Sequence, residues 1–402
     1  MDAYAIRQPI FDSTGAVFGY QIVFDLDLTD VFQAHQNDQA TLKAINDAFV
    51  LVGLDRLTHG HPAFITLPHD IIINGYASLL PAELTVIEIP AAHYPSQELL
   101  DILDKLRADG YRLALAGLDI GTEDNPLLSR VEMVRADFQL LTDEDRVEIA
   151  ELFHAKGMKI IAENLTTQEE HSQAVSLGYD LFQGIFFCEP TIVAGRDLPA
   201  FKGNHLRLLK ELNQSEMDVR GVEDVIKREV ALSYKLLRYI NSASFGLRST
   251  ISNVRQAVML LGERGMKQWA SVAVMSDLVS DRPLELMCTS VQRARFAEEI
   301  ARASLLRNRA NDLFTMGLFS LMDAIVGRPL EEIIREISMA EDVRDTLLGE
   351  PGPLREVYDL VVAYERGQWI QAFKLAKSIG VSPPDLRQMY LGAIDWANAS
   401  AA

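Results

Sequence analysis

The chain has 402 residues, of which 48% are hydrophobic and 24% are charged, and its formal net charge is −19. This length and composition are typical of a globular protein of two or three domains, and the acidic excess argues against nucleic acid as a partner. The sequence contains no run of about eighteen apolar residues, so no membrane span is predicted, and its first residues do not resemble a signal peptide. Two cysteines are too few for a disulfide framework. We therefore expect a cytoplasmic protein without membrane association.

The sequence changes its character near residue 200. Residues 1–200 carry 31 acidic and 12 basic side chains, whereas residues 201–402 carry 26 of each. At the same place the apolar pattern changes from short strand-like runs to the helical period of about 3.6 residues. We predict two domains, 1–195 and 196–402, with Thr191–Gly203 as the connector.

The first half begins with a predicted β-hairpin. Two β-rich runs, Tyr4–Ile10 and Val17–Phe24, flank the turn sequence Asp12–Gly15. A helix is expected at Asn37–Leu51, and short strands then alternate with helices. The strands are Ala63–Leu67, Leu84–Ile89, Arg112–Ala116, Val131–Ala136, Lys159–Ala162 and Leu181–Phe187, and the helices lie near His69–Leu79, Ser96–Asp109, Thr142–Lys156 and Thr167–Leu177. Eight strands in this alternation pair mainly in parallel, which predicts a closed (βα)8-type barrel, shorter than the usual length of about 250 residues.

The second half shows only helical periodicity. Its expected helices are Leu206–Asn213, Gly221–Glu229, Leu232–Ile240, Val254–Leu261, Gly265–Leu278, Leu286–Arg307, Asp312–Ile325, Leu330–Ile337, Glu341–Leu348, Leu354–Tyr364, Trp369–Ser378 and Pro384–Trp396. Glycine, proline and asparagine separate them, and no strand pattern occurs. We predict an all-α domain of about 200 residues.

One stretch of the first half carries a recognisable pattern. An apolar strand ends at Glu163, a helix with a capping sequence at Thr166 and Thr167 follows, and a second strand contains Gln183 and Gly184. The sequence of Lys159–Pro190, KIIAENL…LGYDLFQGIFFCEP, resembles the last part of an EAL domain, which is the fold of cyclic di-GMP phosphodiesterases. The opening text QPIFDSTGAVFGYQIVF resembles the EAL opening. The resemblance implies a shortened α/β barrel of EAL (TIM-like) type.

The resemblance also implies where the site residues of such an enzyme fall. Two of its glutamates are retained at Glu88 and Glu163, and its glutamine is retained at Gln183. The family's lysine is replaced by Arg135, with Asp137 kept beside it. The other positions depart from the family and are occupied by Gln21, Asp25, Thr66, Ala91, Ala116, Gly117 and Thr166.

These replacements predict the loss of catalysis. Hydrolysis of a phosphodiester by two metal ions needs several carboxylates that hold the ions and activate water. Glu88 and Glu163 alone would not retain two ions, and Asp25 would repel a phosphate where the family has a cation. We expect no bound metal, no cofactor and only unlikely binding of cyclic di-GMP, although Arg135 and Gln183 could still touch a phosphate or base.

The second half resembles an HDOD domain. The text LLRYINSASFGLRSTISNVRQAVMLLGERGMKQWA contains Asn241-Ser242-Ala243 and Ala257…Leu261-Gly262, which match the HDOD signature, and the tail resembles the helical extension of EAL–HDOD proteins. The related HD phosphohydrolases hold a metal with histidines and an adjacent His-Asp pair. Here all eight histidines lie at or before His205, and the positions of the pair hold Ser320 and Leu321. The resemblance therefore implies a helical domain that has lost its metal site.

The sequence thus indicates an EAL–HDOD signal transduction protein with a degenerate EAL domain. We expect a non-enzymatic pseudoenzyme that binds an unidentified signalling protein, with a homodimer plausible by analogy. Two alternatives stay open. One is a cyclic di-GMP receptor without hydrolysis, and the other is a residual phosphodiesterase with relocated ligands such as Asp119 or Asp137, together with Glu88 and Glu163.

Overall fold

The computed structural model describes residues 4–24, 54–91, 95–118, 124–189, 226, 230–241, 251, 253–278, 283–337 and 339–401. The chain forms two compact units. The first comprises Met1–Glu189 with Tyr364–Trp369, and the second comprises Pro190–Ala363 with Ile370–Ala402. The predicted helices at 37–51, 206–213 and 221–229 lie wholly or almost wholly outside the described residues.

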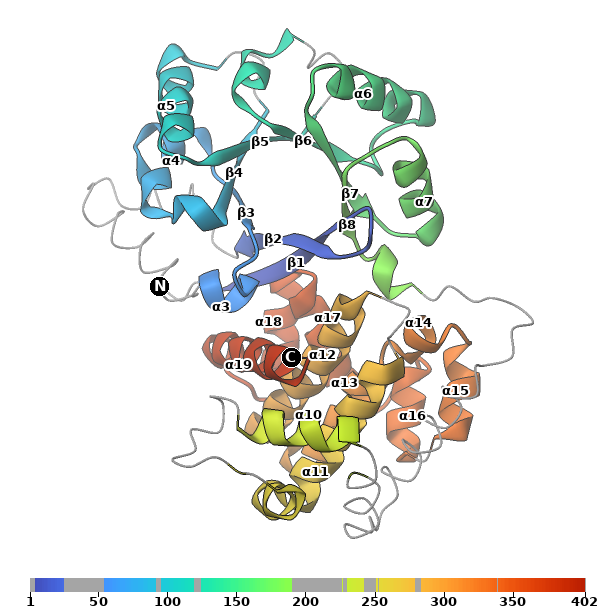
Figure 1. The fold of residues 1–402 in the computed structure, drawn as a ribbon. Coiled ribbons are helices and arrows are strands. Elements are labelled where there is room, and N and C mark those ends of the chain that lie inside the picture. Colours follow the sequence, from blue (N-terminus) through green and yellow to red (C-terminus); the bar gives the residue numbers. More distant parts are fainter. Residues whose placement is uncertain are drawn as a thin grey trace. The chain divides into compact units, whose positions relative to one another are not determined.

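The first unit is a closed eight-stranded barrel in which the strands follow one another in sequence order (Figure 1). Its strands are β1 Ala5–Asp12, β2 Val17–Phe24, β3 Ala63–Thr66, β4 Thr85–Pro90, β5 Arg112–Ala116, β6 Met133–Asp137, β7 Lys159–Leu165 and β8 Leu181–Gly184. β1 runs antiparallel to both neighbours, and every other pair is parallel. The predicted hairpin and the predicted shortened α/β barrel are confirmed.

Local sequence explains how several elements begin and end. In the hairpin turn, the Asp12 carboxylate accepts hydrogen bonds from the Thr14 amide at 2.8 Å and the Ala16 amide at 3.1 Å, as in an Asx turn. Capping boxes start two helices: Thr142 with Asp145 starts α6, and Thr167 with Glu170 starts α7. The helices of this unit are α3 Leu54–Thr58, α4 His69–Ile73, α5 Gln97–Ala108, α6 Asp143–Ala155 and α7 Gln168–Ser176.

Two predicted elements of the barrel are shorter than expected. The helix expected at 69–79 ends at Ile73 and is followed by a separate 3-10 turn, Tyr76–Leu79, because Gly75 adopts a left-handed conformation between them. The last strand was expected to reach Phe187, but β8 ends at Gly184 and Phe186–Cys188 forms another 3-10 turn. Asn74-Gly75 and Gly184 stand at these two breaks, and such residues are local signals of a turn that the predicted boundaries did not take into account.

The barrel interior is built in layers, because alternate residues of each strand point inward. One layer is apolar and consists of Ile10, Phe64, Val86, Ala114, Met133, Ile161 and Leu181, with Phe18 packed against it. Two residues further along each strand toward the carboxyl ends of the parallel strands, the same faces carry mainly polar side chains. We call this second set the polar layer; it consists of Gln8, Gln21, Thr66, Glu88, Arg135, Glu163 and Gln183, with Ala116 as its apolar member.

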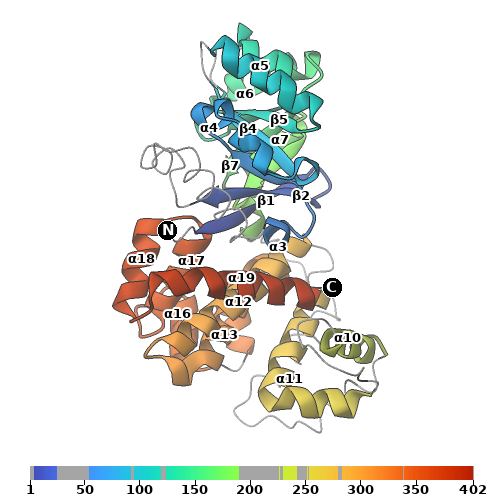
Figure 2. The same cartoon turned by 90° about the vertical axis from the view of Figure 1, so that its left-hand side faces the viewer.

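The second unit is helical in every part that the structure describes, as predicted. Its helices are α10 Val230–Ile240, α11 Val254–Leu278, α12 Leu284–Ala303, α13 Ala310–Phe319, α14 Met322–Val326, α15 Leu330–Glu336, α16 Glu341–Leu347, α17 Arg355–Glu365, α18 Trp369–Ser378 and α19 Pro383–Ala401. α12 packs against both α13 and α19 (Figure 2). Within the described ranges, we find no helix whose length and hydropathy would suit a membrane span.

The two helices expected at 254–261 and 265–278 correspond to the two segments of α11, which are separated by non-helical backbone at Gly262, where φ is 66°. Helix boundaries in this unit differ from the predicted ones at two other places. The helix expected to end at Arg307 stops at Ala303. The helix expected at 312–325 is interrupted at Ser320 and Leu321, which separate α13 from α14.

The contact between α12 and α13 depends on a glycine. A Cβ on Gly317 would lie 2.5 Å from the Ala294 amide nitrogen and 2.6 Å from its Cα, closer than real contacts allow. We expect Gly317→Ala to lower the free energy of unfolding by about 1–3 kcal/mol, as overpacking does. The matched control is Gly392→Ala in α19, where a Cβ meets nothing within 4 Å. Equal melting temperatures for Gly317→Ala and the parent chain in calorimetry would contradict the expected clash.

Candidate functional site at the barrel mouth

The polar layer is organised around Arg135 of β6. Its Nε donates to Glu88 Oε1 at 2.8 Å, and its Nη1 donates to Glu163 Oε2 at 3.0 Å. Nη2 makes a second contact with Glu88 Oε1, and Nη1 also donates to the Gln183 side-chain oxygen. The Arg135 side chain is only 2% exposed. One buried guanidinium therefore joins β4, β6, β7 and β8 inside the barrel.

Glu88 is the most buried carboxylate of this layer, with 0% of its side chain exposed. Its Oε2 accepts a hydrogen bond from the Thr66 hydroxyl at 2.8 Å and a longer one from the Gln21 amide at 3.4 Å. Since Oε1 faces Arg135, both oxygens already have donors. A buried carboxylate needs such partners, because an unpaired charge in the interior is strongly unfavourable.

Three glutamine side chains close the layer on the hairpin side. The Gln183 amide donates to Gln8 Oε1 at 2.9 Å and to Gln21 Oε1 at 2.5 Å. Gln8 and Gln21 face each other across the antiparallel pair of β1 and β2. Sequence reasoning missed Gln8. Its position two residues before the inward-facing Ile10 was the available signal, since side chains two apart share a strand face.

Exposure to solvent distinguishes the two carboxylates of the layer. Burial raises the pKa of the Glu163 carboxyl, and the nearby Glu88 and Asp137 add to this, although Arg135 works against it. Burial opposes the charge of Arg135, but Glu88 and Glu163 outweigh it and raise the pKa of the guanidinium. Glu163 keeps 19% of its side chain exposed. It is therefore the carboxylate of this pair that a ligand at the barrel mouth can reach.

Among the remaining predicted positions that the structure describes, Thr166, Ala116 and Gly117 make no side-chain hydrogen bond to this cluster. The Thr166 hydroxyl donates to Glu170 at 2.9 Å, next to the N-terminus of α7. Ala116 accepts a backbone hydrogen bond from Ala91, and neither Ala116 nor Gly117 brings a side-chain ligand. Asp25 and Asp119 lie outside the described residues.

Asp137 lies beyond the polar layer at the end of β6. Its carboxylate accepts a hydrogen bond from the Asn164 amide at 2.8 Å. Asn164 has a φ of 60°, a left-handed conformation that is uncommon outside glycine. Asp137 thus helps to hold the strand end that carries Glu163.

The described donors do not fit a pair of divalent ions. Such ions need several carboxylate oxygens with free lone pairs. Both oxygens of Glu88 accept hydrogen bonds inside the layer, and Glu163 faces Arg135. In the described part of the chain, no group of three or more histidine, cysteine, aspartate or glutamate side chains is placed to hold a metal ion.

In the helical unit, the positions expected to mark a lost metal site are buried. The Ser320 hydroxyl donates to Gly317 O at 2.8 Å and accepts from Arg293 Nη1 at 3.2 Å. Leu321 is 5% exposed and belongs to the core. Burial raises the pKa of the nearby Asp323, and the charge of Arg293 opposes this. Ser320 and Asp323 thus lie close to the buried Arg293.

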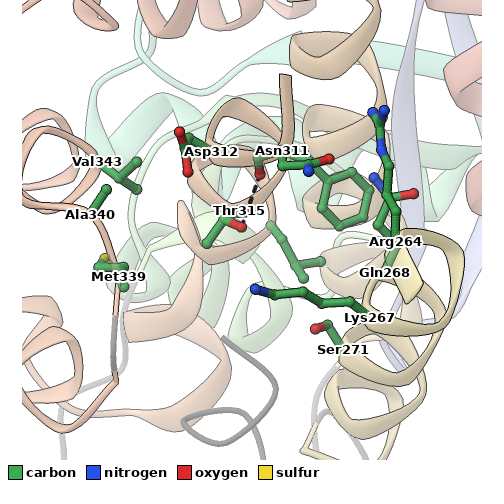
Figure 3. A pocket seen from close by; sticks show the side chains of 12 residues that line it. Arg264, Lys267, Gln268, Ser271, Asn311, Asp312, Thr315, Met339, Ala340 and Val343 are labelled. Atoms are coloured by element: carbon green, nitrogen blue, oxygen red, sulfur yellow. Dashed lines mark hydrogen bonds between the residues drawn. The ribbon is translucent and has the colours of Figure 1, made fainter. Parts of the chain in front are cut away.

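The helical unit also contains a cavity of about 90 Å³ between α11, α13 and residues 339–343 (Figure 3). Lys267 points toward its centre, and burial lowers the pKa of this ammonium group. Several polar groups of the lining already bind neighbouring protein atoms: Thr315 donates to Asn311 O at 3.0 Å, and Gln268 donates to Glu298 at 2.7 Å. The sequence gave no indication of this cavity.

Comparison with known proteins places both halves. Residues 198–330 match the HDOD domain family, which confirms the predicted HDOD domain. The cyclic di-GMP phosphodiesterase CdgJ of Vibrio cholerae is 30% identical over 397 residues, covering 98% of this chain and 92% of CdgJ. The uncharacterized protein YuxH of Bacillus subtilis is 29% identical over 406 residues, covering 99% of this chain and 98% of YuxH.

Solved structures similar to this chain include EAL proteins. An EAL domain protein from Listeria monocytogenes is 16% identical, with a TM-score of 0.37, and the match covers 46% of this chain and 87% of that protein. BlrP1 of Klebsiella pneumoniae, in a calcium and cyclic di-GMP complex, is 20% identical, with a TM-score of 0.38 and coverage of 46% and 54%. TM-scores this low carry no argument about function.

Proposed function

Because the chain belongs to the family of EAL–HDOD signal transduction proteins that includes CdgJ, we propose that it hydrolyses cyclic di-GMP at the mouth of its barrel. The observation that carries this proposal is the 30% identity to CdgJ, a cyclic di-GMP phosphodiesterase, over 98% of this chain. The cluster of buried charges at the carboxyl ends of the barrel strands supports the location, since barrel enzymes build their sites at that face.

Two expectations from the sequence are corrected by this relative. The protein was expected to be non-enzymatic, and cyclic di-GMP binding was expected to be unlikely. Both expectations are wrong, since CdgJ, similar over nearly the whole chain, is a cyclic di-GMP phosphodiesterase. The sequence argument compared ligands position by position and did not anticipate that Glu88, Arg135 and Glu163 form one connected cluster.

Within this proposal, Glu163 is the general base. Hydrolysis adds water across one P–O bond and opens the ring, so a base must take a proton from the attacking water. Glu163 is partly exposed, and its raised pKa brings it nearer to the working pH, which favours proton transfer. Gln183 offers an amide and a carbonyl for orienting a phosphate or guanine edge, and Arg135 holds both side chains in place.

We further propose that hydrolysis proceeds on a donor set that is reduced relative to other EAL domains. The altered barrel positions are Gln21, Asp25, Thr66, Ala91, Ala116, Gly117, Arg135 and Thr166; separately, Ser320 and Leu321 stand in the helical unit where HD phosphohydrolases have their metal-binding pair. This reduction predicts slow turnover, because fewer groups stabilise the charge that develops at phosphorus. We also propose that the barrel domain comprises residues 1–195 and the helical domain residues 196–402.

The test is conversion of cyclic di-GMP to the linear dinucleotide by the full chain, in buffers without divalent ions and in buffers with Mg²⁺ or Mn²⁺, with the product detected by anion-exchange chromatography. We expect product, and we expect Glu163→Gln to lower kcat by about 10²–10⁴-fold, the range for loss of a general base. The control is Glu144→Gln, an exposed carboxylate in the first turn of α6, which should leave the rate unchanged. Absence of product under all these conditions would overturn the proposal.

A further inference from the structure

We propose that the guanidinium of Arg135 is a built-in cation, which occupies the space between Glu88 and Glu163 and thereby keeps divalent ions out of the barrel mouth. The proposal concerns the same site as the proposed function. It makes a statement about metal affinity, however, and does not depend on whether hydrolysis occurs.

Arg135 contacts both carboxylates at the same time. Arg135 bonds to Glu88 through Nε at 2.8 Å and to Glu163 through Nη1 at 3.0 Å, so a single planar group bridges two carboxylates from β4 and β7. A fork of fixed donors suits this task better than a point charge does. No position between the two carboxylates remains where another cation could approach both.

Glu88 and Arg135 are both buried. Glu88 is fully buried and Arg135 is 2% exposed, so neither charge can turn to solvent without opening the layer. Thr66 and Gln21 hold the second oxygen of Glu88 from the opposite side. A divalent ion that binds Glu88 must therefore displace the guanidinium from its ion pairs, and must do so inside a closed barrel.

Arg135 offsets part of the negative charge of the two carboxylates. Glu88 and Glu163 contribute two negative charges, and Arg135 contributes one positive charge. If Arg135 is replaced by a neutral side chain, two carboxylates face each other without a counter-charge, and like charges at this separation repel strongly in a buried site. A divalent ion would then relieve that repulsion, so its binding should become favourable where the parent chain resists it.

The experiment measures Mn²⁺ binding and Mn²⁺-dependent melting of the full chain. The parent chain should show no saturable Mn²⁺ site at millimolar concentration and no change in melting temperature. Arg135→Met should melt at a lower temperature without metal, bind Mn²⁺ at least about tenfold more tightly than the parent chain, and recover melting temperature as Mn²⁺ is added.

Two further variants keep the test decisive. Arg146→Met removes another largely buried barrel cation, whose partner Asp143 is 78% exposed, and it should be destabilised without any recovery in Mn²⁺. Arg135→Lys keeps the charge but loses the fork, and it should fold and bind Mn²⁺ with affinity between those of the parent chain and Arg135→Met. A saturable Mn²⁺ site in the parent chain, or no gain in affinity for either Arg135 variant, would overturn the proposal. Failure of hydrolysis alone would not.

Discussion

Without added metal, Arg135→Met is expected to lower the free energy of unfolding of the barrel by about 3–5 kcal/mol, the cost of removing one partner of a buried ion pair. The loss is large because Glu88, with no exposed side-chain surface, is left without its cation, and Glu163 loses an ion-pair partner as well. Chemical denaturation of the full-length parent chain and of Arg135→Met, with the unfolding transition of the barrel recorded separately from that of the helical unit, measures this loss.

The control for this prediction is an arginine whose ion pair reaches solvent. Arg130 pairs with Asp104 at 3.0 Å, but the two side chains are 19% and 51% exposed. Arg130→Met should therefore cost only about 0–1 kcal/mol through its ion pair, the usual range for surface pairs. Equal destabilisation by the two substitutions would mean that burial of the Arg135 cluster has no particular energetic weight.

Glu298→Gln is expected to destabilise the helical unit by about 1.5–3 kcal/mol near neutral pH, the range for hydrogen bonds to a charged group. Glu298 lies on α12 with 0% of its side chain exposed. Arg295 and Arg302 bind it from the same helix, and Arg264 and Gln268 bind it from α11. The carboxylate therefore ties two helices together.

The pH dependence of this effect follows from the direction of the pKa. Burial alone would raise the pKa of Glu298, but Arg295, Gln268, Arg302 and Arg264 together lower it below its usual value. A lowered pKa stabilises the folded state above the unfolded value of 4.5 and loses this contribution as pH falls through the folded value. The difference between the parent chain and Glu298→Gln should therefore shrink from about pH 7 to about pH 3.

Urea unfolding at these two pH values checks the prediction. The control is Glu332→Gln, because Glu332 is 51% exposed beside Arg328, and this change should alter stability by less than about 1 kcal/mol at either pH. A difference between the parent chain and Glu298→Gln that is independent of pH would show that the carboxylate charge is not the stabilising feature.

Much of the fold could be predicted from the sequence, because its signals are local. The hairpin follows from the turn sequence after Asp12, and the capping text at Thr167 marks the start of α7. Element ends were less predictable where packing determines them. The interruption between α13 and α14 at Ser320 and Leu321 lies inside a mainly apolar stretch of helical periodicity, and α12 stops at Ala303 although the helical pattern continues.

The candidate site was only partly predictable. Resemblance identified Glu88, Arg135, Glu163 and Gln183 individually, and all four lie in one hydrogen-bonded cluster. What the sequence could not supply is which side chains touch, because this depends on barrel closure and strand register. When these contacts are unknown, a replaced metal-binding residue is interpreted as a loss of function. The structure shows instead that Arg135 places a positive charge between the two glutamates.

A similar arrangement occurs in the helical unit. Arg293 is 6% exposed and donates to Ser320, which stands where HD phosphohydrolases have their metal-binding pair, and it is close enough to influence Asp323. In both units a buried arginine thus lies among the positions that the family resemblance assigns to metal binding. The Arg135 guanidinium pairs with two carboxylates, and the Arg293 guanidinium donates to a hydroxyl.

The most direct test of the account is the initial rate at which the full chain opens the ring of cyclic di-GMP, measured beside Glu163→Gln prepared in the same way. The account predicts that the parent chain forms the linear dinucleotide and that the variant does so at least about a hundredfold more slowly. Equal rates for the two proteins, or no linear dinucleotide from the parent chain, would contradict it.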